Sequence, residues 1–241
     1  MRGPFTRCVV KTKASAFSRA DLLFCLFALT LVFTMAISVF ASNKSESQRV
    51  ICFNNLRQVG HAFHMWANDY GDKIQWQVDL PLGGTRGHQI GGNAWWQFSW
   101  ISNQLDSPKL LVCPADVGTT KVASEWGATP GGFLNPNYRN NAISYPLFLH
   151  AQPNAPASLL SGDRNFRVDT IGNSCVYVSA GTCFALFPRG MGAWTNAIHG
   201  LKGHLLLMDG SVPFTTSSEF QQAISSPLQD DNGSLHGLQV R

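Results

Sequence analysis

The chain has 241 residues, of which 44% are hydrophobic and 13% are charged. Ordinary soluble domains carry about 25% charged residues, so uncharged polar side chains must supply much of the surface. The formal net charge is +4, but the basic excess comes from Arg2, Arg7, Lys11 and Lys13, and the rest of the chain is balanced. Because the rest of the chain carries no excess positive charge, we do not expect it to bind nucleic acid. The length suits one N-terminal segment followed by one domain of about 170 residues.

Residues 22–40 form an apolar stretch without charge, proline or glycine. A helix of this length approaches the ~30 Å hydrocarbon thickness of a bilayer, at about 1.5 Å per residue. The stretch therefore predicts a membrane span, and the basic flank before it predicts a cytoplasmic N-terminus with the remaining chain exported. A cleaved signal peptide and a simple signal anchor are alternative interpretations of the same stretch.

Residues 16–21, with the sequence Ala-Phe-Ser-Arg-Ala-Asp, stand directly before the apolar stretch. They resemble the cleavage and methylation segment of type IV prepilins and type II secretion pseudopilins. The resemblance implies a basic leader at 1–16, cleavage by a prepilin peptidase between Ala16 and Phe17, and methylation of Phe17. It also implies that Asp21 is the carboxylate that is compensated by a neighbouring subunit during assembly.

A long helix is predicted from residue 17 to residue 70, with the membrane span in its lower half. After residue 45, apolar residues recur at spacings of three and four and form one helical stripe, made of Cys52, Leu56, Val59, Phe63, Trp66 and Tyr70. Gly71 and Asp72 supply a stop signal. We expect this stripe to attach the helix to a globular head at 71–226.

Residues 52–60 and 64–70 resemble a large bacterial group of pseudopilin-like proteins with a C-terminal signature of His, nine residues and Asp-Gly. The chain supplies that signature at His199, Asp209 and Gly210. The resemblance implies a structural subunit, a pseudopilin or minor pilin, of a type II secretion or type IV pilus-like filament. It implies like subunits, a prepilin peptidase and an inner-membrane secretion or pilus platform as partners, and a single-pass location in the bacterial inner membrane.

Strand signals come late in the chain. Residues 175–179 and 183–187 flank one turn, and residues 204–208 and 211–214 flank Asp209-Gly210, which suits a type I′ turn. A short helix is expected at 220–224 with Ser218 as its cap, and a loose tail at 227–241. The predicted fold class is α+β and pilin-like: a long N-terminal helix packed against a small C-terminal antiparallel sheet.

Four cysteines follow the apolar stretch, and we expect disulfides between Cys52 and Cys113 and between Cys175 and Cys183. The first would tie the helix to the following loop, and the second would close a hairpin. Four free buried thiols are the alternative.

Few residues offer chemistry. His61 and His64 lie one turn apart and could share a metal, but a third ligand is missing from the local sequence. The resemblance implies calcium binding, for which Asp163, Asp169 and Asp209 offer oxygen ligands. Residues 163–165, Asp-Arg-Asn, predict a turn with a structural ion pair.

His199 and Asp209 could form a catalytic dyad, but the chain contains no GxSxG, HExxH or glycine-rich phosphate motif. We therefore expect no enzymatic activity. The alternative to a filament subunit is an anchored binding domain that does not polymerise and that stacks carbohydrate on Trp95, Trp96 and Trp100, although core packing is the more common role of such residues.

Overall fold

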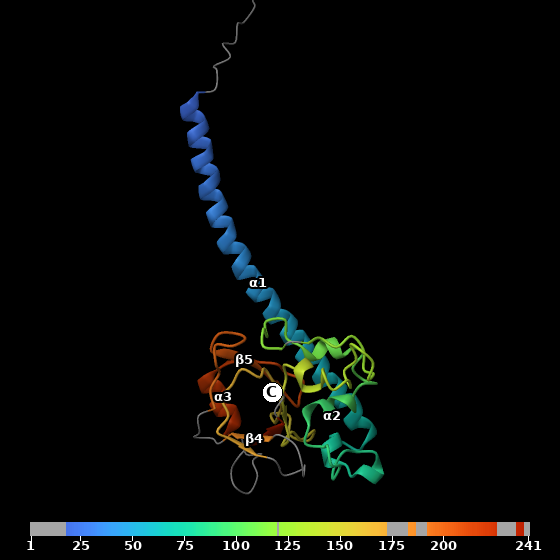
Figure 1. Ribbon diagram of the computed structural model, residues 1–241. Coiled ribbons are helices and arrows are strands. Elements are labelled where there is room, and N and C mark those ends of the chain that lie inside the picture. Colours follow the sequence, from blue (N-terminus) through green and yellow to red (C-terminus); the bar gives the residue numbers. More distant parts are fainter. Residues whose placement is uncertain (1–17, 120, 173–182, 187–191, 226–234, 239–241) are drawn as a thin grey trace, which may run out of the picture. The chain divides into compact units, whose positions relative to one another are not determined.

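The computed structural model describes residues 18–119, 121–172, 183–186, 192–225 and 235–238, leaving out the side chains of residues 35–43 (Figure 1). The chain divides into two compact units, Met1–Lys44 and Ser45–Arg241. Helix α1 (Arg19–Asp69) has 51 residues and contributes to both units.

Helix α1 begins with a capping box. The backbone N–H of Ser18 donates to Oδ2 of Asp21 at 2.9 Å, and the backbone N–H of Asp21 donates to Oγ of Ser18 at 3.2 Å. Two of the backbone groups that would lack partners at a helix start are thereby satisfied. In the following turns every large apolar side chain is exposed, between 44% and 73%: Leu22, Leu23, Phe24, Leu26, Phe27, Leu29, Leu31, Val32 and Phe33.

The structure corrects the predicted membrane span. Among the described residues, no helix combines the length and the apolar character needed to cross a membrane. A span needs about 20 consecutive apolar residues, a length that the described residues of α1 do not supply. The prediction of a transmembrane lower half at 22–40 is wrong, and so is the single-pass inner-membrane location that depended on it.

The second half of α1 buries the stripe that the sequence predicts. Cys52, Leu56, Val59, Phe63 and Trp66 are at most 3% exposed, and Tyr70, just past the helix end, stacks on Trp66 with ring centroids 3.9 Å apart. The helix approaches the sheet closely at Gly60, where an added Cβ would lie 2.8 Å from Cδ1 of Leu206. Gly71, with a positive φ of 65°, follows the helix end.

The described residues of the second unit form one antiparallel sheet of seven strands. Its spatial order is β3-β4-β7-β1-β2-β5-β6, and every pairing is antiparallel. The strands are β1 (Leu147–Phe148), β2 (Leu159–Gly162), β3 (Thr170–Gly172), β4 (Cys183–Leu186), β5 (Lys202–Leu207), β6 (Phe214–Thr216) and β7 (Leu235–Leu238). Figure 1 shows β4 and β5 in the orange part of the chain, with α3 (Ser217–Ile224) nearby.

This sheet corrects the predicted fold class further. The structure is a mixture of helices with a seven-stranded sheet rather than a pilin-like helix on a small C-terminal sheet. Strand β1 precedes the strand signals that the sequence shows, and β7 lies in the segment expected to be a loose tail. Strand β7 pairs with both β4 and β1, so the expectation of a loose tail at 227–241 is wrong for Leu235–Leu238.

The predicted hairpin around Asp209-Gly210 exists as the pair β5 and β6, but its turn is different. Of the two central residues only Gly210 has a positive φ, 82°, whereas a type I′ turn needs two. The backbone N–H of Gly210 donates to the carbonyl of Leu207 at 3.0 Å, which fits a type I turn followed by a left-handed glycine. The other predicted hairpin falls partly outside the described residues, and its strand β4 pairs with β3 and β7.

Five short helices lie between α1 and β1 in the described part of the chain: η1 (Gln75–Gln77), η2 (Leu80–Leu82), α2 (Ala94–Ser99), η3 (Pro108–Leu111) and η4 (Arg139–Ala142). Trp76 is fully buried and donates from Nε1 to the carbonyl of Leu149 at 3.0 Å. Helix α3 is capped by Thr216, which forms a capping box with Glu219, rather than by Ser218.

Candidate functional site

The site begins where β2 ends. Strand β2 pairs with β5, with Gly162 opposite Leu205, and this register carries the next residue, Asp163, alongside His204. The backbone N–H of Asp163 donates to the carbonyl of His204 at 2.9 Å, and the backbone N–H of His204 donates to Oδ2 of Asp163 at 2.7 Å. Asp163 is therefore fixed by the sheet itself.

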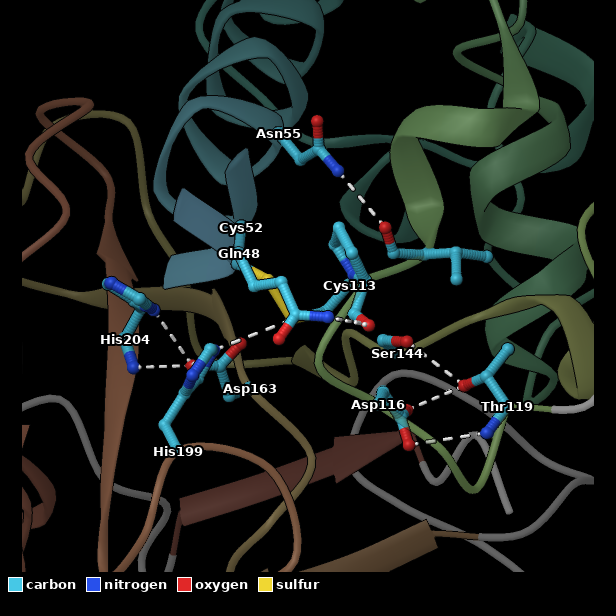
Figure 2. Close-up of a disulfide and its surroundings, with 12 residues drawn as sticks. Gln48, Cys52, Asn55, Cys113, Asp116, Thr119, Ser144, Asp163, His199 and His204 are labelled. Carbon is cyan, nitrogen blue, oxygen red and sulfur yellow. Dashed lines mark hydrogen bonds and ion pairs between the residues drawn. A yellow bond between two sulfur atoms is a disulfide. The ribbon is translucent and has the colours of Figure 1, made fainter. Parts of the chain in front are cut away.

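Two histidines face this carboxylate. Nδ1 of His204 lies 2.9 Å from Oδ2 of Asp163, and Nε2 of His199 lies 3.6 Å from the same oxygen. The three side chains are between 0% and 4% exposed. Figure 2 shows the side chains of His199 and His204 next to that of Asp163. We call Asp163, His199 and His204 the histidine–aspartate cluster.

The predicted disulfide between Cys52 and Cys113 is present and lies beside this cluster. Nε2 of His199 is 3.4 Å from Sγ of Cys113, as Figure 2 shows. The disulfide joins α1 to the chain after η3, and hydrogen bonds from Asn55 to the carbonyl of Val112 and from Gln48 to the carbonyl of Pro114, each 3.0 Å, support the same attachment. The other predicted pair, Cys175 with Cys183, falls partly outside the described residues because Cys175 is not among them.

Burial controls the ionisation of groups around the cluster. Burial lowers the pKa of His199 below its ordinary range, and this effect outweighs the negative charge of Asp163, which acts in the opposite direction. Burial, together with the charge of Asp163, raises the pKa of Tyr145 well above its ordinary range. Both groups are therefore uncharged at neutral pH, and the carboxylate of Asp163 lies in a largely dry environment.

Arg164 makes the ion pair that was expected at residues 163–165, but with a different acid. Its Nε and Nη2 lie 2.5 Å and 2.8 Å from the two carboxylate oxygens of Asp116. Asp116 also accepts from the hydroxyl of Thr119 at 2.6 Å. Burial alone would raise the pKa of Asp116, but the hydrogen bonds and the charge from Arg164 prevail and lower it. The ion pair fixes the segment that carries Asp163.

The three residues of the signature that the resemblance predicted separate into two places. His199 belongs to the histidine–aspartate cluster, whereas Asp209 and Gly210 line an open surface cavity of about 710 Å³ together with Asn54, Arg57, Gln58, His61 and His64. A hydrogen bond from Ser211 to Asp209 lowers the pKa of Asp209. The hypothesis of a catalytic dyad of His199 and Asp209 thus gains no geometric support, and the surface pair His61 and His64 acquires a nearby carboxylate.

Other predicted sites are distributed as follows. Ala16 and Phe17 lie outside the described residues, and Asp21 takes part in the capping box of α1. The three candidate calcium ligands do not form one group in the structure: Asp163 lies in the cluster, Asp209 in the surface cavity, and Asp169 beside β4, where its backbone N–H donates to the carbonyl of Ala185.

Among the tryptophans considered for carbohydrate stacking, Trp95 is 9% exposed and packs edge-to-face on Trp96, as core aromatics do.

Sequence reasoning did not identify His204 or connect His199 with Asp163. The sequence pattern around these residues is weak. His204 opens a predicted strand, and Asp163 directly follows the short segment Leu-Leu-Ser-Gly, which forms β2. Only the pairing of β2 with β5 brings the two residues together. Pairing between segments about 40 residues apart leaves no local pattern in a sequence.

Two sets of side chains in the described part of the chain place potential metal-binding atoms within 4.8 Å of one another. One is the histidine–aspartate cluster, and the other is Cys52, Cys113 and His199. His199 is common to both sets. With the disulfide formed, the sulfur atoms have no thiolate charge to offer, so the cluster is the set whose atoms are better suited to bind a metal. No family model, curated protein or solved structure matches this chain.

Proposed function

We propose that the protein is a structural subunit that assembles with copies of itself, through the first half of α1, into a filament of the type II secretion or type IV pilus-like kind. The observation that supports this proposal is the exposure of every large apolar side chain at residues 22–33. Soluble monomers rarely leave contiguous apolar patches of more than a few hundred Å² exposed. Burial of this surface supplies the driving force, at about 25 cal/mol per Å².

The distribution of these side chains favours several partners rather than one. Successive residues of an α-helix are rotated by about 100°, so Leu22, Leu23 and Phe24 already point to three different sides. Their exposed fractions are 53%, 68% and 73%. A single docking partner covers one face of a helix, whereas a bundle of like helices covers all faces. The pattern is therefore that of a helix surrounded by other helices.

The second unit supplies a folded head for each subunit. It has its own sheet, its own buried core and a disulfide that anchors the second half of α1. The resemblance at residues 16–21 adds the proposal that a prepilin peptidase removes the leader and that a secretion or pilus platform recruits the subunit. Asp21 is exposed, and its hydrogen bonds with Ser18 lower its pKa, so it offers a negative charge at neutral pH.

The proposal is tested with purified full-length chain by sedimentation velocity and negative-stain electron microscopy. In one variant Phe24→Glu and Phe27→Glu place charges on the apolar surface of α1. The matched control carries Val122→Glu and Leu201→Glu, whose side chains are 55% and 62% exposed in the second unit. Wild type and control should form filaments, and the α1 variant should remain monomeric. Equal assembly of all three, or a wild type that stays monomeric, would refute the proposal.

A further inference from the structure

Two features of the histidine–aspartate cluster show that its hydrogen bonding is incomplete. Nε2 of His199 has the sulfur of Cys113, 3.4 Å away, as a weak hydrogen-bond partner, and it lies 3.6 Å from Oδ2 of Asp163, beyond the normal range of about 2.7–3.2 Å for a hydrogen bond. The second carboxylate oxygen of Asp163, Oδ1, is buried and has no hydrogen-bond partner among the described residues. A buried carboxylate oxygen without a partner is costly, so the cluster is incomplete as a purely hydrogen-bonded unit.

From this arrangement we propose that Asp163, His199 and His204 bind one divalent zinc-like metal ion. Two imidazoles and one carboxylate are a donor set that zinc accepts, at about 2.0–2.1 Å from each ligand atom. In a tetrahedron of that size, ligand atoms lie about 3.3 Å apart. The observed separations from Oδ2 of Asp163, 2.9 Å to His204 and 3.6 Å to His199, fall on either side of this distance.

The donor types of the histidine–aspartate cluster exclude calcium, the ion that the resemblance implies. Calcium takes six to eight oxygen ligands and magnesium prefers oxygen with bound water, whereas here the groups that contact Oδ2 of Asp163 are nitrogen groups of His199 and His204. Imidazole nitrogen combined with one carboxylate favours zinc and its first-row neighbours. The proposal therefore concerns a transition-metal site and not a calcium loop.

The surroundings hold the ligands in place. The backbone N–H of His204 donates to Asp163 and fixes the orientation of the carboxylate, as outer hydrogen bonds do in metal sites. Phe214 packs against both imidazoles, with ring centroids 6.0 Å from His199 and 4.8 Å from His204. Sγ of Cys113 lies 3.4 Å from Nε2 of His199. This proposal is independent of filament assembly, because its ligands belong to the second unit alone.

The test uses the full chain with its disulfide intact, stripped of metal and titrated with Zn²⁺ by isothermal calorimetry. The background variant is His61→Asn with His64→Asn, which removes the surface pair that could bind zinc without belonging to the cluster. This variant should still bind one Zn²⁺ per chain. His199→Asn or His204→Asn in the same background should weaken binding by more than the roughly 10–100-fold that is lost when a residue that only hydrogen-bonds to a metal ligand is replaced.

The absorption spectrum of bound Co²⁺ distinguishes the histidine–aspartate cluster from the neighbouring sulfur atoms of Cys52 and Cys113. This measurement uses the background variant, so its result does not depend on whether the ligand variants fold. Co²⁺ bound to the background variant should give the visible absorption of a tetrahedral site without a sulfur-to-cobalt charge-transfer band. Failure of the background variant to bind Zn²⁺ would overturn the proposal. So would a thiolate band, or unchanged binding when His199 is replaced in a variant whose circular dichroism matches wild type.

Discussion

Oδ2 of Asp163 lies 2.7 Å from the backbone nitrogen and 2.9 Å from Nδ1 of His204, so one carboxylate oxygen joins the end of β2 to the start of β5. Both side chains are almost completely buried. Removal of a buried acceptor leaves its donors without partners, which costs more than the hydrogen bonds contribute. The contact therefore matters for stability whether or not a metal is bound.

Asp163→Ala should lower the free energy of unfolding by about 3 kcal/mol or more in metal-free buffer, since two buried donors of His204 lose their acceptor. Urea denaturation followed by tryptophan fluorescence measures the change. Asp106→Ala is the control, because Asp106 is exposed and surface substitutions usually change stability by no more than about 0.5 kcal/mol. Equal effects at the two positions would contradict the role given to Asp163.

The disulfide should stabilise the second unit strongly. It closes a loop with a sequence separation of 61 residues, for which loop entropy in the unfolded chain corresponds to about 4 kcal/mol. Cys52→Ser combined with Cys113→Ser should lower the free energy of unfolding by about that amount. Cys25→Ser is the control, because Cys25 is free and exposed in the described part of the chain. A double variant as stable as this control would show that the crosslink contributes nothing.

The ion pair of Asp116 with Arg164 predicts a pH dependence. Since the pKa of Asp116 is lowered in the folded state, its stabilising contribution is present above its unfolded pKa, about 3.9, and is lost as the pH falls through the folded pKa. Asp116→Asn should cost about 3 kcal/mol at pH 7. The difference from wild type should shrink on acidification below pH 4.

The control for this pair is Asp79→Asn. Asp79 and Arg86 also form an ion pair, but their atoms are 3.7 Å apart and both side chains are more than half exposed. Exposed pairs contribute at most about 1 kcal/mol, so this variant should lie close to wild type at both pH values. A difference between wild type and Asp116→Asn that does not change with pH would contradict the assignment.

Asp21 caps α1 and is proposed to serve assembly, and two substitutions separate these two roles. Ser18→Ala removes the hydroxyl that accepts from Asp21 in the capping box but keeps the negative charge, whereas Asp21→Asn removes the charge and keeps a polar side chain at the cap. If the carboxylate serves assembly, Asp21→Asn should reduce filament yield in electron micrographs and Ser18→Ala should not. The opposite ranking would limit Asp21 to capping the helix.

Features with short sequence spacing could be predicted, and features that depend on long-range pairing could not. The buried stripe from Cys52 to Trp66 follows from helical periodicity, and the hairpin of β5 and β6 follows from two strand patterns around Asp209-Gly210. Strand β1 has only two residues and β7 only four, too few to show a period. Their places in the sheet, like the approach of Asp163 to His204, depend on which distant strands pair.

The apolar stretch at 22–40 shows the other limit of sequence reasoning. Its composition predicted a membrane span, but the described part of α1 does not provide one. What the structure contributes instead is the exposure of the large apolar side chains at residues 22–33 on all sides of the helix. An apolar surface needs a partner, and composition alone does not identify which partner that is.

Crosslinking within α1 tests the proposed assembly most directly. Cys25 is exposed among the apolar side chains, and Val32→Cys adds a second thiol two turns away, so that each chain can link to two neighbours. A short bismaleimide should then give a ladder of dimers, trimers and larger species at dilute concentration, and the ladder should disappear when Phe24→Glu and Phe27→Glu are added. A product that stays monomeric without these charges, or a ladder that persists with them, would contradict the account.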